Sequence, residues 1–257
     1  MLTTAAAFAV CGSAYAADMS VKAPGAPLAP VYSWTGFYGG LQAGYASMNG
    51  SCSQTDTVGF LGGGLPCFFN PSFNSNGAIA GVRGGYDWQS GAFVVGVVGD
   101  FNLTSLKWTQ VFNTAVLESG SAGYGSLKLD WLASVRGRVG WAIDPNWLVY
   151  GTGGFAWGQF DAYSNLQGTC CGNWWARTKT TKSGVVAGGG IEYKLSPHAS
   201  IFAEGLWYGN FGSVDNSRFC PGTSTSQQNT CFATGTYTTS FKVNDIVTAA
   251  VGMNYRF

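Results

Sequence analysis

The amino-acid sequence predicts an all-β protein, an eight-stranded antiparallel transmembrane β-barrel with short periplasmic turns and long external loops. Three observations predict this fold. Residues 247–257 alternate between apolar and small or polar side chains, as a strand with one lipid-facing side does. A triplet of an apolar residue, any residue and Trp or Tyr occurs four times, ending at Trp88, Trp141, Tyr193 and Tyr255. A short turn follows each of the first three triplets.

These turns are expected at residues 89–91, 144–146 and 196–198, where Gly, Pro, Asn, Asp and Ser supply tight-turn geometries. Four units of strand, turn and strand, with the first and last strands closing the ring, give eight strands. About ten residues suffice for a tilted strand to cross a bilayer. The expected strands cover residues 35–46, 78–88, 92–101, 127–141, 147–157, 185–193, 199–208 and 247–257. Because of its glycines, the sequence of residues 147–157 does not indicate which side chains of that strand face inward.

Strand alternation places ten charged residues on the inner face, five of each sign. Two interpretations compete, an ion-selective lumen and a packed network of neutralising pairs. The equal numbers favour the network, because a selective pore usually carries an excess of one sign. An eight-stranded barrel is also just wide enough for its own side chains to fill. The expected lumen charges are Arg83, Lys128, Arg136, Arg138, Arg256, Asp87, Asp100, Asp130, Glu192 and Glu204.

The composition agrees with a membrane barrel. The chain of 257 residues has 25 charged residues and 39 glycines, and 15% of its residues are aromatic, unlike a soluble α/β enzyme. A formal net charge of +1 gives no indication of a nucleic-acid partner. No apolar run has the length of a membrane helix, so a closed ring of strands is the way to satisfy backbone polar groups in lipid.

The chain divides into three parts. Residues 1–16 resemble a signal peptide that ends in a small-x-small cleavage pattern, Ala14-Tyr15-Ala16, although no Lys or Arg precedes the apolar run. Residues 17–33, with three prolines, are expected to form a periplasmic lead-in. Residues 34–257 form the barrel. Its terminal aromatics, Tyr255 and Phe257, are the expected signal for the barrel-assembly machinery, and outer-membrane lipid is the expected solvent.

The cysteines favour an oxidising compartment. Cys11 lies in the signal region, where a lipoprotein is the minor alternative. The other six fall in predicted loops: Cys52, Cys67, Cys170, Cys171, Cys220 and Cys231. An even number fits disulfides, and we expect Cys52–Cys67 and Cys220–Cys231, each closing one loop. The partners of the adjacent Cys170 and Cys171 stay open. Zinc is the alternative, but Cys-x-x-Cys pairs and nearby histidines are missing, so no metal or cofactor site is predicted.

Four long segments are expected to face outside, because outer-membrane barrels keep short turns in the periplasm. They cover residues 47–77, 103–126, 159–181 and 210–240. Their Ser, Thr, Asn, Gly and aromatic content suits an adaptable surface that could bind a surface ligand or host factor.

Several segments resemble a known family. Ala17-Asp18, the Pro-rich lead and Val31–Tyr45 are similar to the opening of the small porin-like or outer-membrane immunogenic proteins of alphaproteobacteria, and Leu148–Ala156 and the Tyr-Arg-Phe end are similar too. The resemblance implies an eight-stranded outer-membrane barrel with envelope-structural, surface-antigen or weak porin-like roles, and no catalytic residues. Six loop cysteines are more than this family leads us to expect.

The sequence therefore predicts a structural or surface protein of the bacterial outer membrane, with its external loops as the recognition surface. A narrow porin-like channel for small solutes is the alternative. An enzyme is disfavoured, because a nucleophile usually needs a nearby base and the single histidine, His198, lies in a predicted turn. The inward acids could form a catalytic pair, but the facing arginines favour salt bridges.

Overall fold

The computed structural model describes residues 33–56, 65–66, 72–113, 122–168, 172–221, 224–226, 229–231 and 234–257. Residues 1–31 form one unit and residues 32–257 another. The expected signal peptide (1–16) and all of the lead-in except Ser33 lie outside the described residues. Within these ranges the regular elements are β-strands, and no helix is long and apolar enough to cross a membrane.

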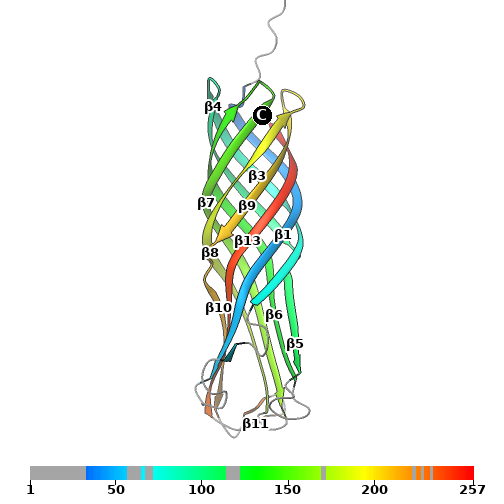
Figure 1. Cartoon of the computed structure of the whole chain (residues 1–257), viewed down its shortest axis with the longest axis vertical. Helices are drawn as coiled ribbons and strands as arrows, with labels where there is room; N and C mark the ends of the chain where they lie inside the picture. The colour runs from blue at the N-terminus through cyan, green and yellow to red at the C-terminus, as the bar shows by residue number, and fades with distance from the viewer. Residues whose placement is uncertain are drawn as a thin grey trace, which may run out of the picture. The chain divides into compact units, whose positions relative to one another are not determined.

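Eight long strands form a closed antiparallel ring, which confirms the predicted barrel (Figure 1). Each strand pairs with the next, and the last pairs with the first over 19 residue pairs. This closure leaves no sheet edge to face lipid. The ring consists of β1 (Gly36–Asp56), β3 (Ser72–Ser90), β4 (Phe93–Thr104), β6 (Ala122–Ala142), β7 (Trp147–Gly168), β8 (Gly172–Lys194), β9 (Ala199–Gly209) and β13 (Thr234–Arg256).

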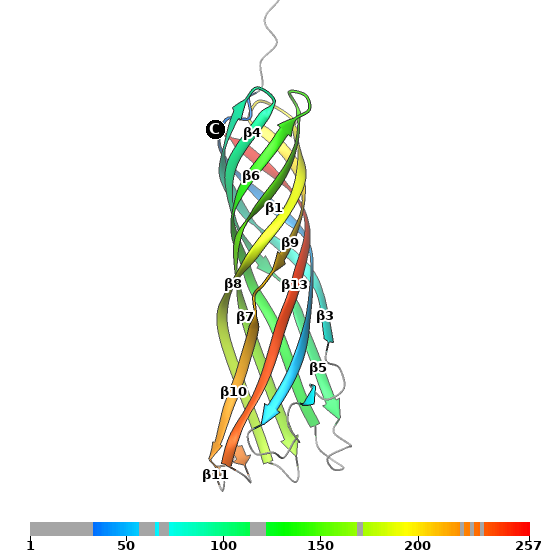
Figure 2. The ribbon, with the colours of Figure 1, turned by 60° about the vertical axis from the view of Figure 1, so that its left-hand side comes forward.

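Two of these strands are continued by separate short strands. β5 (Lys107–Asn113) follows β4 along β6, and β10 (Ser213–Pro221) follows β9 along β13 (Figure 2). Between β9 and β10 the chain passes through Asn210 and Gly212, both with positive φ. The remaining described strands are β2 (Leu65–Pro66), β11 (Ser224–Ser226) and β12 (Asn229–Cys231).

Short turns join the strands at one end of the barrel, where the C-terminus also lies (Figure 1). We call this the short-turn end and the opposite end the far end. In the turn before β7, the Asp144 carboxylate accepts hydrogen bonds from the backbone N–H groups of Asn146 and Trp147, at 2.8 and 2.9 Å. Such an Asx turn holds the chain reversal locally.

The strands are longer than the sequence predicted, and the segments expected as loops are largely wall. β8 and β13 have 23 residues each, about twice what a tilted crossing needs. Near the short-turn end the outer face is apolar, as at Phe37, Val97 and Val251. Toward the far end the pattern inverts, so that Trp108 faces inward and Lys107 outward. A wall in water needs an apolar interior, and its polar exterior gives it the composition of a loop.

In β6 a β-bulge causes this inversion. The pairing register with β7 shifts between Leu129 and Trp131, which leaves Asp130 as the extra residue. One extra residue flips every following side chain to the other face. Leu127 and Leu129 are therefore fully buried, while half of the Lys128 side chain is exposed. The prediction that Lys128 and Asp130 are lumen charges is wrong for this reason.

β13 makes the same adjustment. Asn49 pairs with Asp245 and the next residue, Gly50, pairs with Val243, so that Asn244 is the extra residue. Beyond it Phe241 and Val243 are buried inside the barrel, whereas the intervening Lys242 is exposed. Two strands thus exchange the polarity of their faces through an inserted residue.

Deleting Asp130 should remove the bulge in β6 and return Leu127 and Leu129 to water and Lys128 to an apolar interior. We expect the free energy of unfolding in lipid vesicles to fall by more than about 3 kcal/mol, measured by urea titration of tryptophan fluorescence. Asp130→Asn is the matched control, because it keeps the residue count. If the deletion is no more destabilising than Asp130→Asn, the bulge does not set the phase of β6.

Candidate functional site

The lumen near the short-turn end contains four arginines and four carboxylates. They project from inward-facing positions of β3, β4, β6, β8, β9 and β13, and each is at most 7% exposed. The two signs balance, which is a condition for burying so many charges together. These eight residues were expected in the lumen from the sequence: Arg83, Arg136, Arg138, Arg256, Asp87, Asp100, Glu192 and Glu204.

Arg136 is the centre of the first cluster. Its Nη1 donates to Glu204 Oε1 at 3.0 Å and its Nη2 donates to Asp100 Oδ2 at 2.8 Å. Two hydroxyl groups donate further hydrogen bonds to these carboxylates. Ser134 donates to Asp100 Oδ2 at 2.5 Å, and Tyr150 donates to Glu204 Oε2 at 3.0 Å. Both carboxylates therefore have charged and neutral donors.

Arg138 is the centre of the second cluster, closer to the short-turn end. It donates to Glu192 through Nη2 and lies 3.4 Å from Asp87 Oδ2 through Nη1. Asp87 Oδ2 also accepts from Arg256 Nη2 at 3.0 Å. Glu192 Oε1 accepts from Ser200 at 2.6 Å and Asn254 at 3.0 Å. The two clusters join at Tyr150, because the guanidinium of Arg138 lies 3.8 Å from its ring centroid.

The space between these groups is closely filled. A Cβ added to Gly96 would lie 2.2 Å from Asp87 Oδ1, and one added to Gly85 would lie 2.6 Å from the Tyr38 hydroxyl. Only glycine fits such inward positions. Each of the four carboxylates contacts an arginine, so the acids form ion pairs with bases and are not arranged as a free acid pair.

Trp34 lies inside the lumen at the short-turn end. Its side chain is fully buried in a cluster with Val94, Leu148 and Tyr150. Its backbone carbonyl accepts from Arg256 Nη1, and its backbone N–H donates to Gln89 Oε1 at 2.7 Å. Lys194 Nζ lies 4.3 Å from the ring centroid, a cation–π distance. The sequence analysis missed this residue, since nothing in a lone Trp before a strand indicates that it turns inward.

An apolar layer fills the lumen on the other side of the ionic network, toward the far end. Trp108 contacts both Phe73 and Phe241 there, with ring centroids 5.2 and 6.1 Å apart, respectively. Phe160 packs against Phe211 at 5.6 Å. Sequence reasoning missed this layer too, although inward apolar residues alternate with Lys and Asp in the predicted loop segments. The members with no exposed surface are Met48, Leu106, Leu127, Leu129, Ala156, Phe160, Ala162, Phe241 and Ile246.

Other predicted residues lie apart from the lumen. Cys52 was expected in a loop, but it faces inward in β1, is 4% exposed and is disulfide-bonded. The side chains of the other cysteines lie outside the described residues, so the pairings with Cys67 and between Cys220 and Cys231, and the partners of Cys170 and Cys171, stay predictions. His198 lies in the turn before β9, with its Nδ1 2.9 Å from the Arg256 carbonyl oxygen. The described residues include no cluster of His, Cys, Asp and Glu that could hold a metal.

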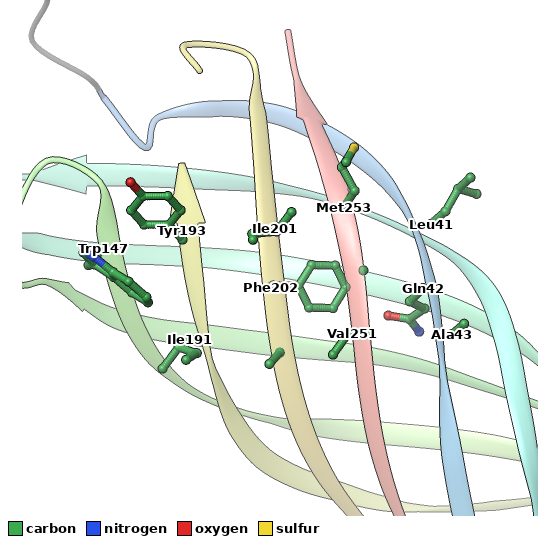
Figure 3. A pocket seen from close by; sticks show the side chains of 12 residues that line it. Leu41, Gln42, Ala43, Trp147, Ile191, Tyr193, Ile201, Phe202, Val251 and Met253 are labelled. Carbon is green, nitrogen blue, oxygen red and sulfur yellow. The ribbon is translucent and has the colours of Figure 1, made fainter. Parts of the chain in front are cut away.

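A shallow groove of about 640 Å³ lies on the outer wall (Figure 3). Leu41 and Ala43 of β1, Ile201 and Ala203 of β9 and Val251 of β13 line it. The small side chains leave a hollow between larger neighbours. Its walls are almost entirely apolar, which suits lipid chains.

A closed antiparallel ring with an apolar outer band and a polar, packed lumen defines a bacterial outer-membrane β-barrel protein. The family model for the outer membrane protein beta-barrel domain matches residues 3–257. The chain belongs to this family and resides in the bacterial outer membrane. The short-turn end therefore faces the periplasm and the far end faces outside.

Curated relatives confirm the resemblance to alphaproteobacterial proteins. The 31 kDa outer-membrane immunogenic protein of Brucella melitensis biotype 1 is 32% identical over 232 residues, which cover 84% of this chain and 90% of that protein. The 22 kDa outer membrane protein of Rhizobium leguminosarum bv. viciae is 34% identical over 134 residues, 52% of this chain and 48% of that protein.

Solved barrels are more distant. OprG from Pseudomonas aeruginosa has 13% identity and a TM-score of 0.46, over 87% of this chain and 96% of that chain. The outer membrane protease OmpT from Escherichia coli has 11% identity and a TM-score of 0.45, over 86% of this chain and 97% of that chain. Such low values say nothing about the activity of this chain.

Arg138→Ala should remove the closer of the two arginines at buried Glu192 and leave Arg256, 4.0 Å away. We expect the free energy of unfolding to fall by about 3–5 kcal/mol, measured by urea titration in lipid vesicles. Adding Glu192→Gln should recover part of this loss, because the incompletely paired charge is then removed. The exposed Lys128→Ala serves as a control and should cost less than about 1 kcal/mol. An Arg138→Ala variant as stable as this control would contradict the network.

Proposed function

We propose that this protein has a structural and surface role in the cell envelope, with its far end as a recognition surface, and that its lumen does not conduct solutes. The observation that carries the proposal is the filling of the lumen by three successive layers. Trp34 lies at the periplasmic end, the arginine–carboxylate network follows, and the apolar layer around Trp108 and Phe241 lies above it. A narrow porin-like channel would need a continuous polar path through all three.

The position of the far end supports the surface role. The strands continue well past the lipid-facing band, so the outer part of the wall and the segments that join it are presented to the exterior. The Brucella relatives are named outer-membrane immunogenic proteins, which describes proteins that immune systems detect. By analogy, we propose that a surface ligand, a host factor or an antibody would contact the far end of this chain.

We also propose that the protein has no enzymatic activity. The Nδ1 atom of His198 is within hydrogen-bond distance of a backbone carbonyl oxygen, and its ring stacks on that of Tyr255 with centroids 5.8 Å apart. It therefore lies at the periplasmic rim, away from the buried carboxylates. Each of those carboxylates contacts an arginine, so they form ion pairs and are not arranged as a free acid pair.

The C-terminal strand is the proposed contact for the barrel-assembly machinery. Tyr255 and Phe257 are 54% and 80% exposed on the outer wall, and their rings contact each other at 5.3 Å. An aromatic pair that faces outward at the end of the closing strand is accessible before the ring closes. This supports the expected role of both residues as an assembly signal.

Single-channel recording tests the closed lumen. The full-length barrel, refolded with its disulfides intact, should give no steady openings in a planar bilayer. We expect the same silence from Trp34→Ala, because the ionic network and the apolar layer still block the path. Correct folding of both proteins is checked by heat-dependent gel mobility.

An Arg136→Ala/Arg138→Ala variant distinguishes the alternatives. Steady openings of the unaltered barrel whose conductance or ion selectivity changes in this variant would overturn the proposal and establish a channel through the network. Folded but silent barrels of both kinds would agree with the proposal. The next measurement would then be antibody or ligand binding to intact cells, with and without removal of the far end by protease.

A further inference from the structure

The outer wall beyond the lipid-facing band carries a row of charged side chains across four strands. Lys107 of β5 pairs in register with Lys128 of β6, which pairs with Asp161 of β7, which pairs with Lys179 of β8. Arg177 lies two residues from Lys179 on the same face. We call Lys107, Lys128, Arg177 and Lys179, with the carboxylates of Asp130 and Asp161, the basic wall patch.

The carboxylates of the basic wall patch are already engaged by its cations. Asp130 accepts from Lys128 and Lys179, both at 2.8 Å. Asp161 accepts from Arg177 Nε at 2.9 Å and from Nη2 at 2.5 Å. Three of the four cations thus contact the two carboxylates. The patch has four positive and two negative groups, a net charge of +2, in a chain whose formal net charge is +1. The rest of the chain therefore has a net charge of about –1, and the positive charge is concentrated at the patch.

Lys107 and Lys128 are like charges placed directly opposite each other. Such a cross-strand pair is destabilising unless an anion lies between them. Lys128 shares Asp130 with Lys179, whereas Lys107 forms no ion pair with any residue in the described part of the chain. The arrangement leaves positive charge available to an external anion.

The patch surrounds a hollow of about 310 Å³ on the wall. Lys107, Lys128 and Arg177 line it, together with the hydroxyl-bearing side chains of Tyr124, Ser126 and Tyr163. Asp161 lines it too, and its carboxylate forms an ion pair with Arg177. Ammonium, guanidinium and hydroxyl groups all donate hydrogen bonds to a phosphoryl group, which presents several acceptor oxygens. Donors that converge on one hollow make a site of this chemistry.

The charge of the basic wall patch is constant over the pH range in which a phosphoryl group is ionised. The ammonium groups of Lys128 and Lys179 lower the pKa of Asp130, and the Arg177 guanidinium lowers the pKa of Asp161. Both carboxylates therefore stay ionised at neutral and mildly acidic pH. Their protonation would release cations only at a pH below the usual range of an aspartate.

The patch lies at the boundary of the lipid-facing wall. One step toward the membrane, Leu103 pairs with Trp131, and the Trp131 ring packs against exposed Phe101 at 5.6 Å. The Trp131 indole N–H donates to Gln159 at 3.0 Å. Trp residues with an apolar body and a polar partner are typical of the membrane interface. Lys128 is three residues from Trp131, at most about 10 Å along the strand, which is the level of lipid head groups.

From this geometry we infer that the basic wall patch binds the phosphoryl groups of an anionic glycolipid in the outer leaflet. The hollow receives the phosphate while the acyl chains lie against the apolar wall below it. The inference rests on the fold, the outer-membrane location and the patch, and it stands whether or not the lumen conducts.

The test compares three variants reconstituted in phosphatidylcholine vesicles. Lys107→Gln and Lys107→Gln/Lys128→Gln remove charge from the patch. Lys242→Gln removes one charge from β13, on another part of the same wall. The probe is diphosphoryl lipid A, with fully dephosphorylated lipid A as the comparison, and binding is measured by native mass spectrometry at increasing salt. We expect the double variant to bind diphosphoryl lipid A at least about tenfold more weakly, the single variant to fall between, and Lys242→Gln to match the unaltered protein.

Three results would overturn the inference. One is equal binding of diphosphoryl lipid A by the double variant and Lys242→Gln. Another is equal binding of the dephosphorylated lipid by the unaltered protein. The third is binding of inorganic pyrophosphate at the patch in detergent without binding of diphosphoryl lipid A, which would assign the site to a free phosphate. Heat-dependent gel mobility checks folding, and Lys107→Gln keeps every ion pair described for the patch, so a folding failure of the double variant does not remove the test. Conductance is recorded separately, so a failure of the proposed closed lumen is distinguishable.

Discussion

A wall that leaves lipid and enters water must exchange the polarity of its two faces, and the architecture of this barrel follows from that constraint. In lipid the outside must be apolar, so polar groups can gather only in the lumen. In water the outside must be polar, and the interior becomes the place for apolar side chains. Inserted residues in β6 and β13 make the exchange without breaking the ring. β4 and β9 instead end at this level and continue as separate strands, β5 and β10.

The same constraint determines what fills the barrel. The membrane-level lumen contains arginines and carboxylates in equal number, which neutralise one another and use neighbouring hydroxyls and amides as further partners. The lumen beyond it resembles the core of a soluble protein, with aromatic rings in contact. The two parts of the lumen therefore differ in what fills them. One contains arginine–carboxylate ion pairs, and the other is mostly apolar.

Within the bilayer, the sequence was sufficient to predict strand positions, the closed ring and the eight buried charges, because a period of two is visible when one face contacts lipid. For the part of the wall beyond the bilayer, the sequence was misleading, because strands there were predicted as loops. Around Lys107 and Lys179, outward Lys, Thr and Ser look like loop residues, and the inward partners are too sparse to stand out. The phase error at Lys128 has a different cause, since a bulge adds one residue without any compositional sign. The place of Trp34 depends on contacts with Val94 and Leu148, which are distant in sequence.

The long strands also raise the outer rim of the barrel above the membrane. A strand of 23 residues measures about 75 Å along its length at roughly 3.3 Å per residue, and a tilted crossing uses about 10 of those residues. With a tilt of about 40°, the remaining wall raises its outer rim roughly 30 Å above the apolar band. Whatever the rim contacts is therefore met well clear of the lipid surface. The height is fixed by a hydrogen-bonded cylinder, so the rim is held at this distance with little sideways freedom.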